Sequence, residues 1–290
     1  MARKKTLIVG CGYLGERVAR RLVAAGDRVH ATTRSLGRAI ELSRLGIDAV
    51  VADVTVPESL AKLPEVDRVL YCVGFDRSKG LPIRAVYVDG LANVLEAFAE
   101  KVGHLVYASS TGVYGQDGGE WVDEESPAEP ASESGRACLD AEGLIGSTEG
   151  LSSTILRYSG LYGPGRIMRL EGLRRGEPIA GDPDRFLNLI HIDDAASVAI
   201  AALDRPEGQA LYLASDDRPG PRREFYTLAA AALGAPAPTF EPPAPGSREA
   251  AREGTNKRVA NARMKSGLGV TLAYPDITTG VSAALGAQVG

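Results

Sequence analysis

Cysteine is scarce in this chain and follows no ligand pattern. The 290 residues contain three cysteines, Cys11, Cys72 and Cys138, which lie far apart, without a C-x-x-C pair and without a histidine beside them. An odd, scattered set predicts neither a disulfide framework nor a zinc site, and it fits a reducing cytoplasm. We therefore expect no metal centre.

Long hydrophobic runs and a surplus of basic residues are missing as well. No stretch approaches the ~18 consecutive apolar residues of a membrane span. The apolar run that follows the basic start ends at Gly10, well short of the ~7 residues that a signal peptide requires. Lysine and arginine number 33 against 37 aspartates and glutamates, a net charge of -4. This balance disfavours partners such as nucleic acids and anionic membranes, so we expect a cytoplasmic protein that acts on a small molecule.

Short apolar runs alternate with amphipathic stretches over the first two thirds of the chain. The periodicity predicts helices over residues 15–25 and 84–101. It predicts strands over residues 6–9, 28–33, 48–52, 68–73, 104–109, 154–158 and 209–214. Strands separated by helices of this length indicate βαβ units and a parallel sheet. The predicted fold class is α/β, a Rossmann-type doubly wound parallel sheet.

The alternation weakens after about residue 160. We predict a larger domain with the doubly wound sheet over residues 1–160, continued by 187–214, and a smaller, discontinuous C-terminal domain over 161–186 and 215–290. Residues 117–134 are acidic and poor in aliphatic side chains, which predicts an exposed loop. Residues 235–252 are rich in proline and predict a connection along the surface.

A glycine-rich hexapeptide, Gly10-Cys-Gly12-Tyr13-Leu14-Gly15, follows the first predicted strand and opens a helix. In a G-x-G-x-x-G turn, the first glycine permits the tight turn, the second allows the backbone to approach a pyrophosphate, and the third allows close packing of helix on strand. The exposed amides of the helix N-terminus attract phosphates. This context predicts a dinucleotide site, and the alternative is a purely structural β–α turn.

The end of the second predicted strand indicates which dinucleotide binds. NAD enzymes place an acidic residue there to bond the ribose 2′-hydroxyl, but no acidic residue lies between Asp27 and Glu41. Arg34 stands at this position instead and can pair with a 2′-phosphate. The sequence therefore favours NADP(H), with NAD(H) as an open possibility. A solvated Arg34 on a loop is the other interpretation.

Further candidates lie after the third and fourth strands. Asp53 and Val54 are placed to reach the adenine, although Asp53 can also cap a helix. Gly74 comes where backbone must pass close to a ligand. Asn93, within an otherwise good helix, either contributes to the site or ties down a neighbouring strand.

Three ordered motifs resemble the extended short-chain dehydrogenase/reductase family, also called NAD-dependent epimerase/dehydratases. They are the segments Ala108–Gly115 (ASSTGVYG), Leu156–Gly165 (LRYSGLYGPG) and Asn188–Ala195 (NLIHIDDA). The resemblance covers nearly the whole chain, and it implies that the larger domain, 1–160 with 187–214, is the NAD(P)-binding domain and that the smaller one is a substrate domain. Within the family, the start Gly-Cys-Gly-Tyr-Leu-Gly and the segment Asn256–Arg263 (NKRVANAR) look like an atypical branch. The resemblance implies further cofactor contacts at Ser109 and Tyr158, and a homodimer through the helices over 84–101 and 134–147.

The resemblance also implies a catalytic Ser/Thr, a tyrosine and a lysine, and here the chain departs from the pattern. Ser110 takes the Ser/Thr position. Ser134 and Cys138 stand where the family has Tyr-x-x-x-Lys, because no tyrosine lies between 115 and 157 and no lysine between 102 and 256. A serine hydroxyl cannot replace a phenol without a separate base, and Cys138 is interpreted as a small buried hydrophobic residue.

Tyr114, Glu142 and His191 remain as possible proton-transfer groups, and Tyr114 and Ser110 are the catalytic candidates. The structural interpretations of the three are a pocket wall, a solvated helix residue and a satisfied hydrogen bonder. The expected function is an NADP(H)-dependent oxidoreductase or epimerase. The alternative is a non-catalytic NADP(H)-binding sensor or scaffold. A nucleotide-sugar enzyme is a further hypothesis, because a diphosphate could bind a group of basic residues, Arg166, Arg169, Arg174 and Arg175.

Overall fold

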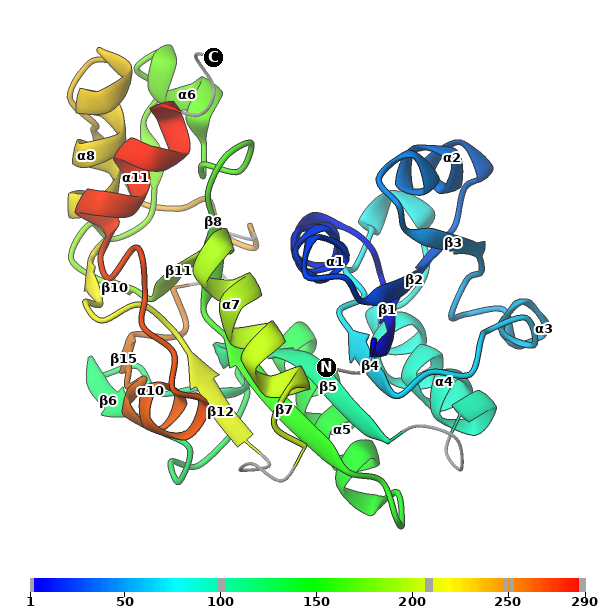
Figure 1. Ribbon diagram of the computed structural model, residues 1–290. Helices are drawn as coiled ribbons and strands as arrows, with labels where there is room; N and C mark the ends of the chain where they lie inside the picture. The colour runs from blue at the N-terminus through cyan, green and yellow to red at the C-terminus, as the bar shows by residue number, and fades with distance from the viewer. Residues whose placement is uncertain (1–2, 99–102, 207–210, 248–249, 251–252, 287–290) are drawn as a thin grey trace.

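A parallel β-sheet forms the centre of the computed structural model, which describes residues 3–98, 103–206, 211–247, 250 and 253–286. Within these residues the sheet has seven strands in the order β3-β2-β1-β4-β5-β7-β12 (Figure 1). Their bounds are β1 Lys5–Val9, β2 Arg28–Thr33, β3 Asp48–Val51, β4 Arg68–Tyr71, β5 His104–Ser110, β7 Ser153–Tyr158 and β12 Leu211–Ala214. The strand order reverses beside β1, which confirms the predicted Rossmann-type fold.

Helices cover both faces of the sheet because each presents one apolar face. Helix α1 (Tyr13–Ala24) buries Leu14, Val18 and Leu22, each contributing roughly 1.5–3 kcal/mol. It packs with α2 (Leu36–Arg44), α7 (Ile192–Leu203) and α10 (Ala262–Leu268) on one face. The opposite face carries α3 (Pro57–Leu60), a π-helical turn (Ala85–Asp89) that runs into α4 (Gly90–Phe98), and α5 (Glu133–Ser147).

A second hydrophobic cluster lies beyond the carboxyl ends of the strands, where α6, α8 and α11 gather at one end of the molecule (Figure 1). Its elements are β8 Gly160–Tyr162, α6 Leu170–Arg174, β9 Ile179–Ala180, β10 Phe186–Leu187, β11 Leu189–His191, β13 Gly220–Pro221, α8 Arg222–Leu233, β14 Phe240–Glu241 and α11 Ile277–Gly286. Met264 and Leu268 of α10, however, pack with the sheet. The division of the chain into two domains stays a prediction.

Several expected boundaries shift. The exposed loop predicted over 117–134 is wrong in part, because it contains β6 (Glu120–Val122), which pairs with β15 (Lys257–Val259) and buries Val122. The connection predicted over 235–252 contains β14, which pairs with β9. The ends of the predicted helix 84–101 and strand 209–214 lie outside the described residues. Homodimerisation through α4 and α5 stays a prediction.

Candidate functional site

A cleft of about 460 Å³ opens at the carboxyl ends of the central strands. Ten of the predicted site residues line it, together with Arg166 of the predicted basic group and with residues that the sequence did not single out, such as Asp76 and Lys79. The ten are Gly10, Gly12, Tyr13, Leu14, Arg34, Asp53, Val54, Gly74, Ser109 and Tyr158. The topology alone explains this convergence, since ligands of doubly wound sheets bind where the strand order reverses.

The three glycines of the turn meet different surroundings. Gly10 has φ +94°, and a Cβ there would lie 2.8 Å from the backbone of Cys72. A Cβ on Gly15 would lie 2.6 Å from the carbonyl oxygen of Gly10, so this glycine packs the helix onto the turn without lining the cleft. A Cβ on Gly12 would meet no atom within 4 Å. Gly12 therefore faces open space at the floor of the cleft.

The N-terminus of α1 has the features of an anion site. Gly12 is its N-cap and supplies no side-chain hydrogen bond to the first turn. The amides of a first helical turn lack partners within the helix and carry the positive end of the helix dipole. With Gly12 leaving room above them, these residues fit the pyrophosphate of a dinucleotide.

Arg34 lines the cleft just after β2, where NAD enzymes have a carboxylate. Its Nη2 lies 3.1 Å from Oδ2 of Asp76, and both side chains are partly exposed. The hydroxyl of Ser78, with help from Arg34, holds the pKa of Asp76 below its usual value. Ser35 caps α2 by accepting a bond from the amide of Arg38. The site thus offers a guanidinium beside a helix N-terminus.

The residues after β3 and β4 have structural roles beside their place in the cleft. Asp53 accepts bonds from the amide and hydroxyl of Thr55, at 2.9 and 2.8 Å, and so fixes its own turn. Asn93 does not line the cleft; its amide donates to the carbonyl oxygen of Val54 at 2.8 Å. This bond ties α4 to the wall of the cleft, which agrees with the structural interpretation of Asn93.

A buried ion pair closes the far end of the cleft. Ser109 donates to Oε1 of Glu142 at 2.5 Å, and Arg157 donates to Glu142 through Nε at 3.0 Å and through Nη2 at 2.6 Å. The side chains of Glu142 and Arg157 are 6% and 7% exposed. The interpretation of Glu142 as a solvated helix residue is wrong, because Arg157 on β7 faces it. An arginine in the middle of an apolar strand was the available signal, since a buried charge requires a partner.

Tyr114 belongs to this buried network and lies outside the cleft. It is 0% exposed; its hydroxyl donates to the carbonyl oxygen of Asp123 at 2.8 Å and accepts a bond from Arg157 at 2.7 Å. Burial raises the pKa of Tyr114. Tyr158 lines the cleft, but its hydroxyl donates to Ala195 and burial raises its pKa far above the usual value. We therefore do not retain Tyr114 as a proton-transfer group, and Tyr158 stays a predicted cofactor contact.

Neither of the positions at which the family has its tyrosine and lysine carries a group that ionises readily. Cys138 packs in an apolar cluster with Val113, Val122 and Val259, and burial raises the pKa of its thiol to about 12. Ser134 is exposed, and its hydroxyl lies 3.2 Å from that of Ser132. The protonated thiol of Cys138 is neither a cation nor a nucleophile at neutral pH. Ser110, half-buried at the end of β5, accepts a bond from the amide of Gly112.

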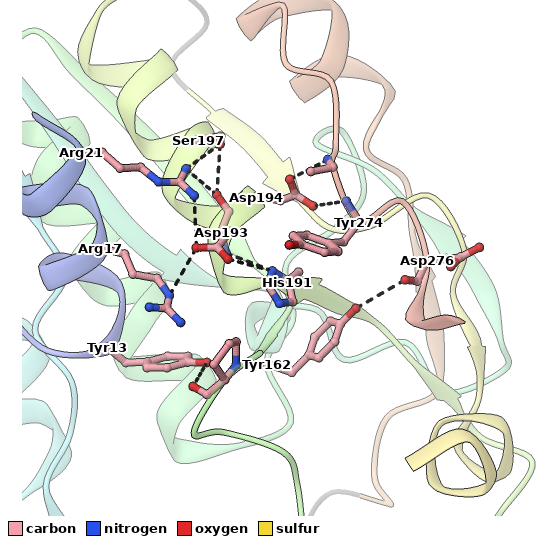
Figure 2. Close-up of polar contacts among 12 residues, drawn as sticks. Tyr13, Arg17, Arg21, Tyr162, His191, Asp193, Asp194, Ser197, Tyr274 and Asp276 are labelled. Carbon is pink, nitrogen blue, oxygen red and sulfur yellow. Dashed lines mark hydrogen bonds and ion pairs between the residues drawn. The ribbon is translucent and has the colours of Figure 1, made fainter. Parts of the chain in front are cut away.

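His191 caps α7 at the border of the second cluster (Figure 2). Its Nδ1 accepts a bond from the amide of Asp193 at 3.3 Å, whereas its buried Nε2 has no partner in the described part of the chain. Burial lowers its pKa, so the ring is neutral at pH 7. Only one of its two ring nitrogens thus forms a hydrogen bond in the described residues, whereas the structural interpretation expected a fully hydrogen-bonded histidine.

The model of the NAD dependent epimerase/dehydratase family matches residues 6–213. The chain belongs to this family. Protein YeeZ of Escherichia coli is 28% identical over 94% of this chain and 97% of its own. The 3-diazoavenalumate denitrifying reductase of a Streptomyces species is 27% identical over 96% and 99%. A solved structure from Methylobacillus flagellatus is 34% identical, with a TM-score of 0.80 over 100% of both chains.

Membership of this family makes the chain an NAD(P)-dependent, oxidoreductase-like or epimerase-like enzyme. None of the helices that the structure describes is long and apolar enough to cross a membrane. In the same described ranges, no three His, Cys, Asp or Glu side chains gather into a metal site. The cleft at the glycine-rich turn is therefore the place to seek the cofactor.

Proposed function

We propose that this protein is an NADP(H)-dependent oxidoreductase that exchanges a hydride with a small molecule at the Ser109 end of the cleft. The observation that carries the cofactor preference is the guanidinium of Arg34 at the end of β2, where a carboxylate would repel a 2′-phosphate. Bound NADP(H) would supply the hydride. Gly10, Gly12 and the first turn of α1 would hold its pyrophosphate.

Ser110 is the residue that we assign to orienting the substrate oxygen. Its oxygen accepts from Gly112, and among the described residues its own proton has no acceptor. The hydroxyl of Ser110 can therefore donate a hydrogen bond to a carbonyl oxygen of the substrate. We assign Ser110 no proton transfer, because no base contacts its hydroxyl in the described ranges.

Nicotinamide absorbance at 340 nm tests this function. The protein would be mixed with NADPH and a panel of ketones, aldehydes and conjugated enones, and we expect oxidation of NADPH by at least one class. Ser110→Ala should lower this turnover about 100-fold, the loss of one hydrogen bond that stabilises the developing charge, whereas Ser134→Ala should leave it unchanged. NADPH binding without oxidation across the panel would favour the cofactor-sensing alternative.

The nucleotide-sugar hypothesis receives less support. Of the four arginines proposed to bind a diphosphate, Arg166 alone lines the cleft. Arg174 and Arg175 form exposed ion pairs with Glu171 and Glu177. A solvated basic surface describes these two better than a ligand site.

A further inference from the structure

Arg166 approaches the glycine-rich turn from the other side of the cleft. It follows β8 in the segment Gly163–Arg166, where the amide of Gly163 donates to the carbonyl oxygen of Arg166 and the amide of Arg166 donates back, at 3.3 and 2.9 Å. This tight turn fixes the backbone that carries the side chain. The guanidinium lines the cleft together with Gly12 and Tyr13.

Tyr13 provides the surface on which Arg166 rests. The Cζ atom of Arg166 lies 5.3 Å from the centre of the Tyr13 ring, within the range of a cation–π contact. The Tyr13 hydroxyl donates to the carbonyl oxygen of Pro164 at 3.1 Å. The ring therefore binds the Gly163–Arg166 turn at two points.

Arg166 differs from the other arginine at the Tyr13 ring, Arg17, in its counter-ion. Arg17 also lies 5.3 Å from the Tyr13 ring, but its Nε is 3.5 Å from Oδ1 of Asp193 (Figure 2). Arg21 pairs with the same carboxylate at 3.1 Å. Within the described ranges, Arg166 has no carboxylate partner. A positioned guanidinium without a counter-ion, facing the open end of α1, is complementary to an anion.

We propose that Arg166 binds the diphosphate of the dinucleotide, opposite the amides of α1, with Tyr13 as its platform. This inference rests on the proposed cofactor and names an additional binding residue for it. Guanidinium and phosphate form paired, charge-assisted hydrogen bonds that a neutral side chain cannot replace. Because Arg166 belongs to the segment that leads into α6, the bound diphosphate would fasten this segment to the glycine-rich turn.

Binding of three ligands by calorimetry tests the assignment. NADPH and 2′-phospho-ADP-ribose both contain the diphosphate, whereas adenosine 2′,5′-bisphosphate carries a single phosphate at the 5′ position. We expect Arg166→Gln to weaken binding of the first two about tenfold or more and to change binding of the third less than threefold. Tyr13→Leu should reproduce this pattern, because it removes the platform.

Arg169→Gln is the matched control. Arg169 lies in the same segment and is exposed like Arg166, but it bonds the carbonyl oxygen of Pro178 and does not line the cleft. The Arg169→Gln variant should bind all three ligands as the wild type does.

Three results would overturn the proposal. Equal NADPH affinity of wild type and Arg166→Gln would remove Arg166 from the site and leave the proposed function intact. Weaker binding of NADPH alone would place Arg166 at the nicotinamide end. A wild-type protein that binds none of the three ligands would overturn both this inference and the proposed cofactor.

Discussion

The cleft at the glycine-rich turn and the place of the expected catalytic pair lie at the same edge of the sheet, yet they are built in opposite ways. At the cleft, Gly12 leaves space and the first turn of α1 has no side-chain cap. At the N-terminal half of α5, Cys138 fills an apolar cluster. Glu142, further along the helix, is matched by Arg157. The N-terminus of α1 is therefore open, whereas packing occupies the position of Cys138, at which the family has its lysine.

The largest effect is expected at the ion pair of the closed region. Glu142→Ala should lower the free energy of unfolding by about 3–5 kcal/mol, because it leaves the buried guanidinium of Arg157 without a counter-charge. Urea denaturation measures this difference. The double variant Glu142→Leu/Arg157→Met should recover most of the loss, since it removes both charges. If Glu142→Ala is as stable as the wild type, the pair of Glu142 with Arg157 does not stabilise the closed region.

The next effect concerns the open region. Gly12→Val should weaken NADPH binding by about 100-fold and leave the melting temperature unchanged, because the added side chain enters space that only a ligand uses. Gly15→Ala is the contrasting control: its Cβ would lie 2.6 Å from the Gly10 carbonyl oxygen, so it should lower the melting temperature. If Gly12→Val binds NADPH normally, the cleft is not the cofactor site.

A third test compares Glu142 with a buried carboxyl, that of Asp216, whose Oδ2 has no hydrogen-bond partner in the described part of the chain. Asp216 is 1% exposed, and burial raises its pKa to about 8. The folded state therefore holds this proton up to about pH 8, whereas the unfolded chain releases it near pH 4. Stability should fall as pH rises between these values, by about 1.4 kcal/mol per pH unit.

Asp216→Asn should remove this pH dependence, because an asparagine side chain does not titrate. Its amide oxygen can still accept the bond that the backbone amide of Arg218 donates to Oδ1 of Asp216 at 3.3 Å. Between pH 6 and 7.5 the variant should gain about 2 kcal/mol on the wild type. Unfolding curves of both proteins at both pH values measure this difference. A stability difference between variant and wild type that does not change with pH would show that Asp216 is ionised in the folded state.

The smallest effect is expected at Cys138. Cys138→Ala should lower the free energy of unfolding by about 1 kcal/mol, a typical cost for a small core truncation, with NADPH oxidation unchanged. Loss of turnover with an unchanged melting temperature would instead make the thiol part of the chemistry.

Local patterns in the sequence predicted the sheet and the cleft well. The strand over residues 28–33 has the predicted bounds, and the glycine-rich turn lies between strand and helix as expected. Such features depend on residues that are neighbours in sequence. The pairing of β6 with β15, the contact of Glu142 with Arg157 and the approach of Arg166 to Tyr13 depend on tertiary packing. For the same reason Tyr114 could be taken for a site residue, although it is buried against Arg157.

Our proposal for this protein depends on the cleft binding NADP(H) and on Arg34 selecting it. Calorimetric titration of the wild type and Arg34→Ala with NADPH and NADH tests both points. We expect the wild type to bind NADPH at least about tenfold more tightly than NADH, and Arg34→Ala to lose this preference while still binding NADH. Equal affinities in the wild type, or tighter binding of NADH, would contradict it.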